Sequence, residues 1–222
     1  MRINLVAALA LLAVPVLALT QPAQQPTPNA VRPTTVRVPV KVQRLLATTD
    51  DLTALRTARQ KTAGTLETLN ANRRNLRLPP IDMVPINRTK VPVLFMPAAS
   101  FRKAFRVAST SDHFVLSGGD DSVGIVLTGT RVAPLSSRPF ETRPLEPKLR
   151  ATFDNESAAA GSTGSIRDVS VTMTEDGVDV SFTRFGALYD LRIACAKKDA
   201  SECQTDSALK LIANSTLLGG GE

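Results

Sequence analysis

Residues that build common metal and catalytic sites are scarce in this sequence. The chain of 222 residues has one histidine, His113, and two cysteines. A structural zinc site takes about four ligands, which so few histidines and cysteines do not supply. A serine–histidine relay would have to use His113, and the sequence has no Gly-x-Ser-x-Gly motif. We therefore predict no metal, no cofactor and no catalytic residue, and interpret His113 as a histidine at the surface or at the edge of a strand.

Long apolar runs are confined to the beginning of the chain. Met1-Arg2 is followed by an apolar stretch over residues 3–19, and no later stretch approaches the roughly 20 apolar residues that span a bilayer. A basic start before a short apolar run is typical of a secretory signal peptide. We predict a signal peptide over residues 1–20, cleaved after Ala18 or Thr20, and a periplasmic or secreted mature protein without a transmembrane segment. An uncleaved anchor is the alternative.

The two cysteines, Cys195 and Cys203, lie close together near the C-terminus. In an oxidising compartment an isolated pair at this spacing is expected to form a disulfide, and we predict that bond here.

Positive charge is concentrated in one part of the sequence. Residues 21–80 contain ten lysines and arginines against three acids, whereas residues 81–222 contain 16 basic and 17 acidic residues. This asymmetry indicates an acidic partner, such as an anionic envelope component or an envelope protein. We predict no nucleic-acid partner, because the basic segment lacks aromatic side chains on which bases stack. The alternative is a solvated arm without a partner. The candidate binding residues are Arg56, Arg59, Lys61, Arg73, Arg74 and Arg77.

The basic segment divides into a linker and an arm. Residues 21–35 are rich in proline, glutamine and threonine, so we predict a disordered linker. Residues 36–80 form the basic arm, in which alternation over residues 36–42 predicts an edge strand.

The second half of the arm, residues 50–76, predicts a helix that is capped by Thr49 or Asp50. Its leucines lie on one stripe, which indicates docking against the protein's own core. A coiled coil or an amphipathic membrane helix is the alternative interpretation.

Residues 81–222 are expected to form an α+β domain of short strands and turns. One strand, residues 122–130, is expected to be buried on both faces because apolar residues occupy most of its positions. The elements predicted before the C-terminal third are strands at 91–96, 113–117 and 122–130, a short helix at 98–107 and a long irregular loop at 133–167.

A β-hairpin is predicted around Asp176-Gly177, because Asp-Gly between two alternating runs is a strong hairpin signal. A two-residue loop at this point would place Met173 opposite Val180, with every apolar residue on one face. Phe185-Gly186 predicts a second turn, followed by a third strand.

The last predicted element is an amphipathic helix that begins at Thr205 or Asp206 and runs to Leu218, where three glycines end it. A sheet with one apolar face followed by such a helix is a two-layer solution. We therefore predict an α+β fold in which an antiparallel β-sheet of about four to six strands is packed by a C-terminal helix and preceded by an N-terminal helix.

Short motifs near the C-terminus carry a family resemblance. Tyr189-x-Leu191-x-x-x-Cys195, followed by Cys203 and a helix with Leu209-x-x-Ile212-Ala213, looks like the C-terminal end of uncharacterised exported proteins of Gram-negative bacteria. The strand–strand–helix order is also similar in outline to PsbP/Mog1-like domains and anti-sigma sensor domains. These groups share no catalytic residue, so the resemblance implies a binding or structural domain.

The sequence therefore predicts a non-catalytic exported protein that binds a component of the cell envelope or a protein partner through its basic arm. Two alternatives remain open. Ser100-Phe101-Arg102-Lys103 matches the Ser-x-x-Lys motif of penicillin-binding enzymes, which would make the protein a cell-wall hydrolase acting through Ser100 and Lys103. The other alternative is a periplasmic carrier of a lipid or apolar ligand, with a pocket beneath the 133–167 loop.

Overall fold

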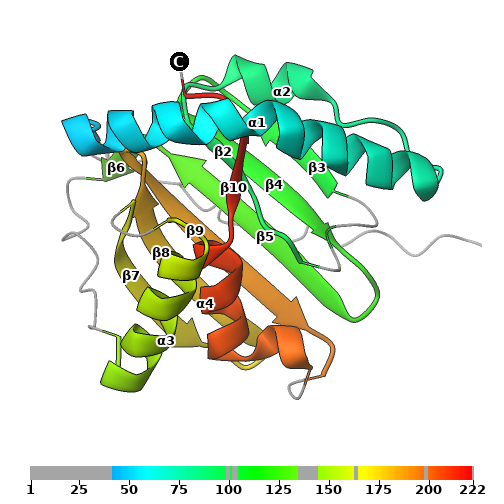
Figure 1. Cartoon of the computed structure of the whole chain (residues 1–222). Helices are drawn as coiled ribbons and strands as arrows, with labels where there is room; N and C mark the ends of the chain where they lie inside the picture. Colours follow the sequence, from blue (N-terminus) through cyan, green and yellow to red (C-terminus); the bar gives the residue numbers. More distant parts are fainter. Residues whose placement is uncertain are drawn as a thin grey trace, which may run out of the picture. The chain divides into compact units, whose positions relative to one another are not determined.

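The fold is α+β, as predicted, and Figure 1 shows its helices and strands. The computed structural model describes residues 42–98, 101, 105–134, 145–162, 165–197 and 200–221. These residues belong to one compact unit, Pro39–Glu222. The predicted signal peptide, the predicted linker and the predicted strand at 36–42, apart from its last residue, lie outside the described residues.

A six-stranded antiparallel sheet forms the centre of the fold, in the order β3-β4-β5-β9-β8-β7. This confirms the antiparallel sheet expected from the sequence. Two runs of consecutive strands meet where β5 pairs with β9, which brings together segments far apart in the chain. The strands are β3 (Phe105–Ser109), β4 (His113–Gly119), β5 (Val123–Thr130), β7 (Ile166–Met173), β8 (Gly177–Arg184) and β9 (Ala187–Cys195).

The sheet has one buried face and one more exposed face. In β5 the side chains of Val123, Ile125 and Leu127 are buried, whereas Val126 on the opposite face is 37% exposed. The expectation that this strand is buried on both faces is therefore wrong. Apolar side chains from helices complete the core on the buried face, and α3 and α4 lie in front of the sheet in Figure 1.

The long basic helix, α1 (Thr49–Asn75), is present where the sequence predicts it. Its N-cap is Thr48 rather than Thr49 or Asp50, and Thr48 forms a reciprocal capping box with Asp51. Leu55 is buried in the core, and Leu66 and Leu69 pack against it. Three leucines of the predicted stripe therefore dock on the protein's own core, whereas Leu52 and Leu76 are exposed, and α1 belongs to the same compact unit as the sheet.

The C-terminal segment differs from the prediction. Helix α4 (Thr205–Ala213) has Gln204 at its N-cap and ends five residues before Leu218. The chain then forms a short strand, β10 (Thr216–Gly219), which pairs with β2 (Val93–Phe95). Both partners are rich in buried apolar residues, and pairing satisfies the backbone groups that this burial removes from water.

The other two-stranded sheet pairs β1 (Val42–Arg44) with β6 (Val132–Pro134). It joins the start of the described chain to the segment that follows β5.

Two predictions about the middle of the chain need correction, and one helix was not predicted. The short helix predicted at 98–107 is wrong at its end, where residues 105–107 belong to β3; Phe101 lies in a 3₁₀ turn, and residues 99–100 and 102–104 lie outside the described chain. Phe101 and Phe105 form a cluster with Phe95, with ring centroids 5.7–6.2 Å apart. The 133–167 segment is not one irregular loop, since it contains α3 (Pro147–Ala159). Pro147 at the first helical turn and the alanines at the far end both favour a helix. A further short helix, α2 (Met83–Arg88), was not predicted.

The hairpin between β7 and β8 is confirmed, but its register is not. Met173 pairs with Val178 rather than with Val180, and the turn consists of Glu175 and Asp176. Gly177 belongs to β8 instead, where its backbone lies directly against the carbonyl oxygen of Ile193. A shift of two residues preserves the face of every side chain, so the apolar pattern alone does not distinguish the two registers.

The second turn is confirmed at Phe185-Gly186. Both residues have positive φ, 54° and 70°, as a two-residue hairpin loop between twisted strands requires.

Candidate functional site

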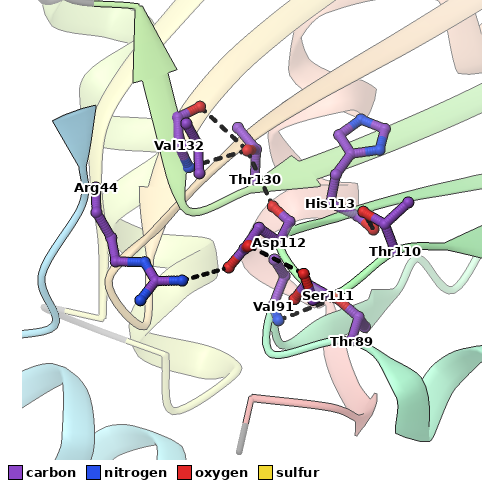
Figure 2. A network of polar contacts seen from close by, with 9 residues as sticks. All are labelled: Arg44, Thr89, Val91, Thr110, Ser111, Asp112, His113, Thr130 and Val132. Atoms are coloured by element: carbon purple, nitrogen blue, oxygen red, sulfur yellow. Dashed lines mark hydrogen bonds and ion pairs between the residues drawn. The ribbon is translucent and has the colours of Figure 1, made fainter. Parts of the chain in front are cut away.

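The Ser111-Asp112-His113 turn joins β3 to β4 and holds the polar network shown in Figure 2. Asp112 accepts hydrogen bonds from the Ser111 hydroxyl at 3.0 Å and from Arg44 at 2.8 Å, and these bonds hold its pKa below the ordinary value. The His113 side chain is exposed and points away from Ser111 and Asp112. The three side chains therefore form no catalytic relay, and the network ties β1 to the turn.

Ser100 and Lys103, the pair on which the alternative interpretation as a cell-wall hydrolase depends, lie outside the described residues.

Five of the six candidate basic residues are exposed and one, Arg73, is buried. Arg77 follows the end of α1 and the other five lie within that helix. Arg59 donates a hydrogen bond to the Gly220 carbonyl at 3.2 Å, so it links α1 to the end of β10. The exposed residues of the set are Arg56, Arg59, Lys61, Arg74 and Arg77.

Arg73 has a structural position. Its Nε donates to the Pro79 carbonyl at 2.7 Å, and its guanidinium carbon lies 5.2 Å from the centre of the Phe105 ring. Because Arg73 is only 9% exposed, it is not available to a surface ligand in the way the sequence predicts.

The structure adds a buried arginine that the sequence reasoning did not identify. Arg184, the last residue of β8, is 7% exposed. Its Nη1 donates to the Ser215 hydroxyl at 2.6 Å and to the Ser215 carbonyl at 3.0 Å, and its guanidinium carbon lies 4.7 Å from the centre of the Phe185 ring. Its Nε is buried without a hydrogen-bond acceptor, and no carboxylate of the described chain pairs with it.

Arg184 lines a cavity of about 260 Å³ that is bounded by α1, β10, the end of α3 and the β8–β9 turn. The cavity also contains Lys61, the one member of the predicted basic set that reaches it. The described lining residues are Ala54, Thr57, Ala58, Lys61, Thr65, Ala160, Gly161, Ser165, Arg184, Phe185, Ser215, Thr216 and Leu217.

The electrostatics of this cavity are positive. Both charged residues in its described lining are cations. Burial lowers the pKa of Arg184 to about 10, a value at which the guanidinium still carries its proton at neutral pH. The neighbouring C-terminal end of α4, just before Ser215, is the negative end of the helix dipole and helps to hold the charge. Both hydrogen bonds of Arg184 go to neutral atoms of Ser215, so its charge has no counter-charge among the described residues and the cavity suits an anion.

The alternating pattern of β8 could have identified Arg184 from the sequence. Val178, Val180, Phe182 and Arg184 share one parity in β8, and all four are buried. An arginine at an inward position of an alternating strand is unusual, because buried charges require partners.

The predicted disulfide is confirmed: Cys195 at the end of β9 is bonded to Cys203 in the 3₁₀ helix Ser201–Cys203, with Cα atoms 6.3 Å apart. None of the described helices combines the length and the apolar character that crossing a bilayer requires. The described residues also contain no cluster of three histidine, cysteine or acidic side chains in a metal-binding arrangement.

Comparison of the chain with protein-family models, with curated proteins and with solved structures gave no match.

Proposed function

We propose that this protein is a non-catalytic, exported binding protein that holds a small anionic ligand in the cavity between α1 and β10. The observation that carries the proposal is the buried guanidinium of Arg184, which lacks a carboxylate partner in the described chain and lines a cavity with a second cation, Lys61. Burying an unpaired charge is unfavourable, and a bound carboxylate or phosphate would offset that cost.

The size and the charge of the cavity favour a small anion over a lipid. Its volume of about 260 Å³ lies below the roughly 300–1,000 Å³ of pockets that hold drug-sized molecules. An uncharged apolar ligand would also leave Arg184 and Lys61 without a counter-charge. The excess positive charge of residues 21–80 supports the same choice, because a positive field raises the local concentration of anions.

The disulfide supports the proposed location outside the cytoplasm. Structural disulfides persist in oxidising compartments and are rare where glutathione keeps thiols reduced. Together with the signal-peptide pattern of residues 1–20, the bonded pair Cys195–Cys203 favours a cell-envelope or secreted binding protein.

Calorimetric titration of the full chain with small anions at constant ionic strength tests this function. Phosphate, acetate, hexanoate and gluconate form a suitable set. We expect at least one of them to bind, and we expect Arg184→Met to weaken that binding at least about tenfold, because a charge-assisted pair is lost.

Arg192→Met is the matched control, since Arg192 also lies in the sheet but is exposed and pairs with Asp176. Its removal should leave the affinity unchanged. Binding that is equal in the wild type and in Arg184→Met, or no binding of any of these anions, would refute the proposed function.

A further inference from the structure

Most of the hydroxyl groups that line the cavity already donate a hydrogen bond to a backbone carbonyl. In each case the side-chain hydroxyl is the donor and the carbonyl oxygen of a residue three or four positions earlier accepts. The four donations are Thr57 to Thr53 at 3.2 Å, Thr65 to Lys61 at 3.1 Å, Ser165 to Ser162 at 2.7 Å and Ser215 to Ile212 at 2.6 Å.

These hydrogen bonds determine whether the hydroxyl groups act as donors or as acceptors toward a ligand. A hydroxyl has one proton to donate and two lone pairs that accept. The four committed hydroxyls therefore present acceptors, and the oxygen of Ser215 already accepts one bond from Arg184. Of the hydroxyls in the described lining, Thr216 alone makes no such donation.

Donors and acceptors are consequently separated within the cavity. The side chains that can donate to an anionic group are chiefly Arg184 and Lys61. The wall formed by α1 contains Thr57 and Thr65 on either side of Lys61, four residues away in each direction. Residues four apart on a helix lie on the same face, so this wall presents one cation between two acceptors.

We propose that the ligand is a small hydroxylated acid: its anionic group pairs with Arg184 and Lys61, and its hydroxyl groups donate to Thr57 and Thr65. This inference rests on the proposed function and adds the class of ligand. A sugar acid and a sugar phosphate share this chemistry, because both combine one anionic group with several O–H donors.

An acid with an alkyl chain fits the same cavity less well. Its chain would cover the threonine oxygens without giving them a donor, and buried acceptors without a donor are costly. Sites that are built to bond a hydroxyl discriminate strongly against analogues that lack it. The volume of about 260 Å³ equals about nine liquid water molecules, which suits a ligand of this small size.

Gluconate and hexanoate provide a direct test with the full chain, because both are six-carbon monoacids that differ in their hydroxyl groups. We expect gluconate to bind at least about tenfold more tightly by calorimetric titration, as two additional hydrogen bonds imply. Gluconate 6-phosphate can then distinguish a preference for a carboxylate from one for a phosphate.

Threonine-to-valine substitutions identify the residues responsible, since valine keeps the shape and removes the oxygen. Thr57→Val and Thr65→Val should each weaken gluconate binding by about three- to tenfold and leave hexanoate binding unchanged. Thr68→Val is the matched control, because Thr68 makes the same backbone bond, to Gly64 at 2.9 Å, outside the cavity.

The possible results separate the two proposals. Equal affinities for the two acids, tighter binding of hexanoate, or a gluconate preference that survives both valine substitutions would overturn the hydroxylated ligand while leaving an anion site. Absence of any Arg184-dependent binding would instead overturn the proposed function itself.

Discussion

Arg167 joins the sheet to the first turn of α1 by placing its Nη2 2.9 Å from both carboxylate oxygens of Asp51. The Asp51 side chain is 2% exposed, whereas that of Arg167 is 41% exposed. Asp51 also accepts hydrogen bonds from the backbone and hydroxyl of Thr48. This contact fixes the end of α1 that leads into the wall of the cavity, so the position of the wall depends on a pair 116 residues apart in sequence.

Acid should weaken this anchor. Burial by itself raises the pKa of Asp51, but the hydrogen bonds from Thr48 and Arg167 outweigh it and hold the pKa below the ordinary 3.8. A carboxylate whose pKa is lower in the folded state stabilises the fold above its unfolded pKa, and this contribution disappears as the pH falls through the folded pKa. Asp51→Asn should therefore cost about 1–3 kcal/mol at pH 7, and less as the pH falls below 3.8.

Urea unfolding at pH 7 and at pH 3 measures this difference. Asp50→Asn is the control, because Asp50 is the exposed neighbour in the same helical turn. A penalty for Asp51→Asn that is equal at both pH values, or equal to the penalty for Asp50→Asn, would contradict the prediction.

Two glycine-to-alanine substitutions should have opposite effects. A Cβ atom on Gly177 would collide with the carbonyl oxygen of Ile193 on the neighbouring strand, whereas a Cβ on Gly64 in α1 meets no atom within 4 Å. We expect Gly177→Ala to destabilise the protein by more than about 2 kcal/mol, because backbone must shift. Gly64→Ala should stabilise it by about 0.5–1 kcal/mol through helix propensity. Midpoints of urea unfolding compare both; equal effects would show that the close approach of β8 to β9 is absent.

The general fold follows from patterns that involve neighbouring residues. Alternation in β8 and β9 and the turn at Phe185-Gly186 depend on short-range patterns and are present as predicted. The leucine stripe of α1 also follows such a pattern, and Leu55, Leu66 and Leu69 dock as predicted. The prediction of the hairpin register was wrong because Gly177 lies in β8, where only glycine fits against the carbonyl oxygen of Ile193. Sequence patterns within the hairpin contain no information about this contact with β9.

The elements that sequence reasoning missed depend on distant partners. Residues 216–219 continue an apolar helical pattern, but they form β10 because β2, more than 100 residues earlier, offers a backbone edge. The candidate site was missed for the same reason. Lys61 was predicted to bind an anion, but the second cation of the cavity, Arg184, was not. The two residues line the same cavity only because α1 packs onto the sheet.

Reduction of the disulfide should destabilise the domain without removing the site. The two cysteines are eight residues apart in sequence, and neither lines the cavity. On the chain-entropy description closing such a short loop contributes about 2–3 kcal/mol. The double substitution Cys195→Ala with Cys203→Ala should lower the free energy of unfolding by that amount and leave anion affinity unchanged. A loss of anion binding in a variant that is still folded would contradict the separation of the two regions.

Replacing Arg184 should leave the free energy of unfolding nearly unchanged, because we expect this residue to serve ligand binding rather than stability. Burial lowers the pKa of Arg184 from its ordinary value to about 10, so between these two pKa values the unfolded chain binds more protons than the folded one. Stability therefore rises with pH across that window, and below pH 10 the folded protein bears the full cost of the buried charge, on the order of 3 kcal/mol. The two bonds to Ser215 offset part of this cost. Arg184→Met removes both terms, so its unfolding free energy should lie within about 1 kcal/mol of the wild type or above it.

The same variant should lose the increase in melting temperature that a bound anion produces, because ligand that binds the folded state alone stabilises it. Arg192→Met should change neither quantity, since Arg192 is exposed and its ion pairs lie at the surface. Thermal and urea unfolding with and without the anion measure both properties in one set of samples. A loss of more than about 3 kcal/mol in ligand-free Arg184→Met would show that the guanidinium holds the fold together. In that case, the bonds to Ser215 rather than a ligand would explain why an arginine is buried at the end of β8.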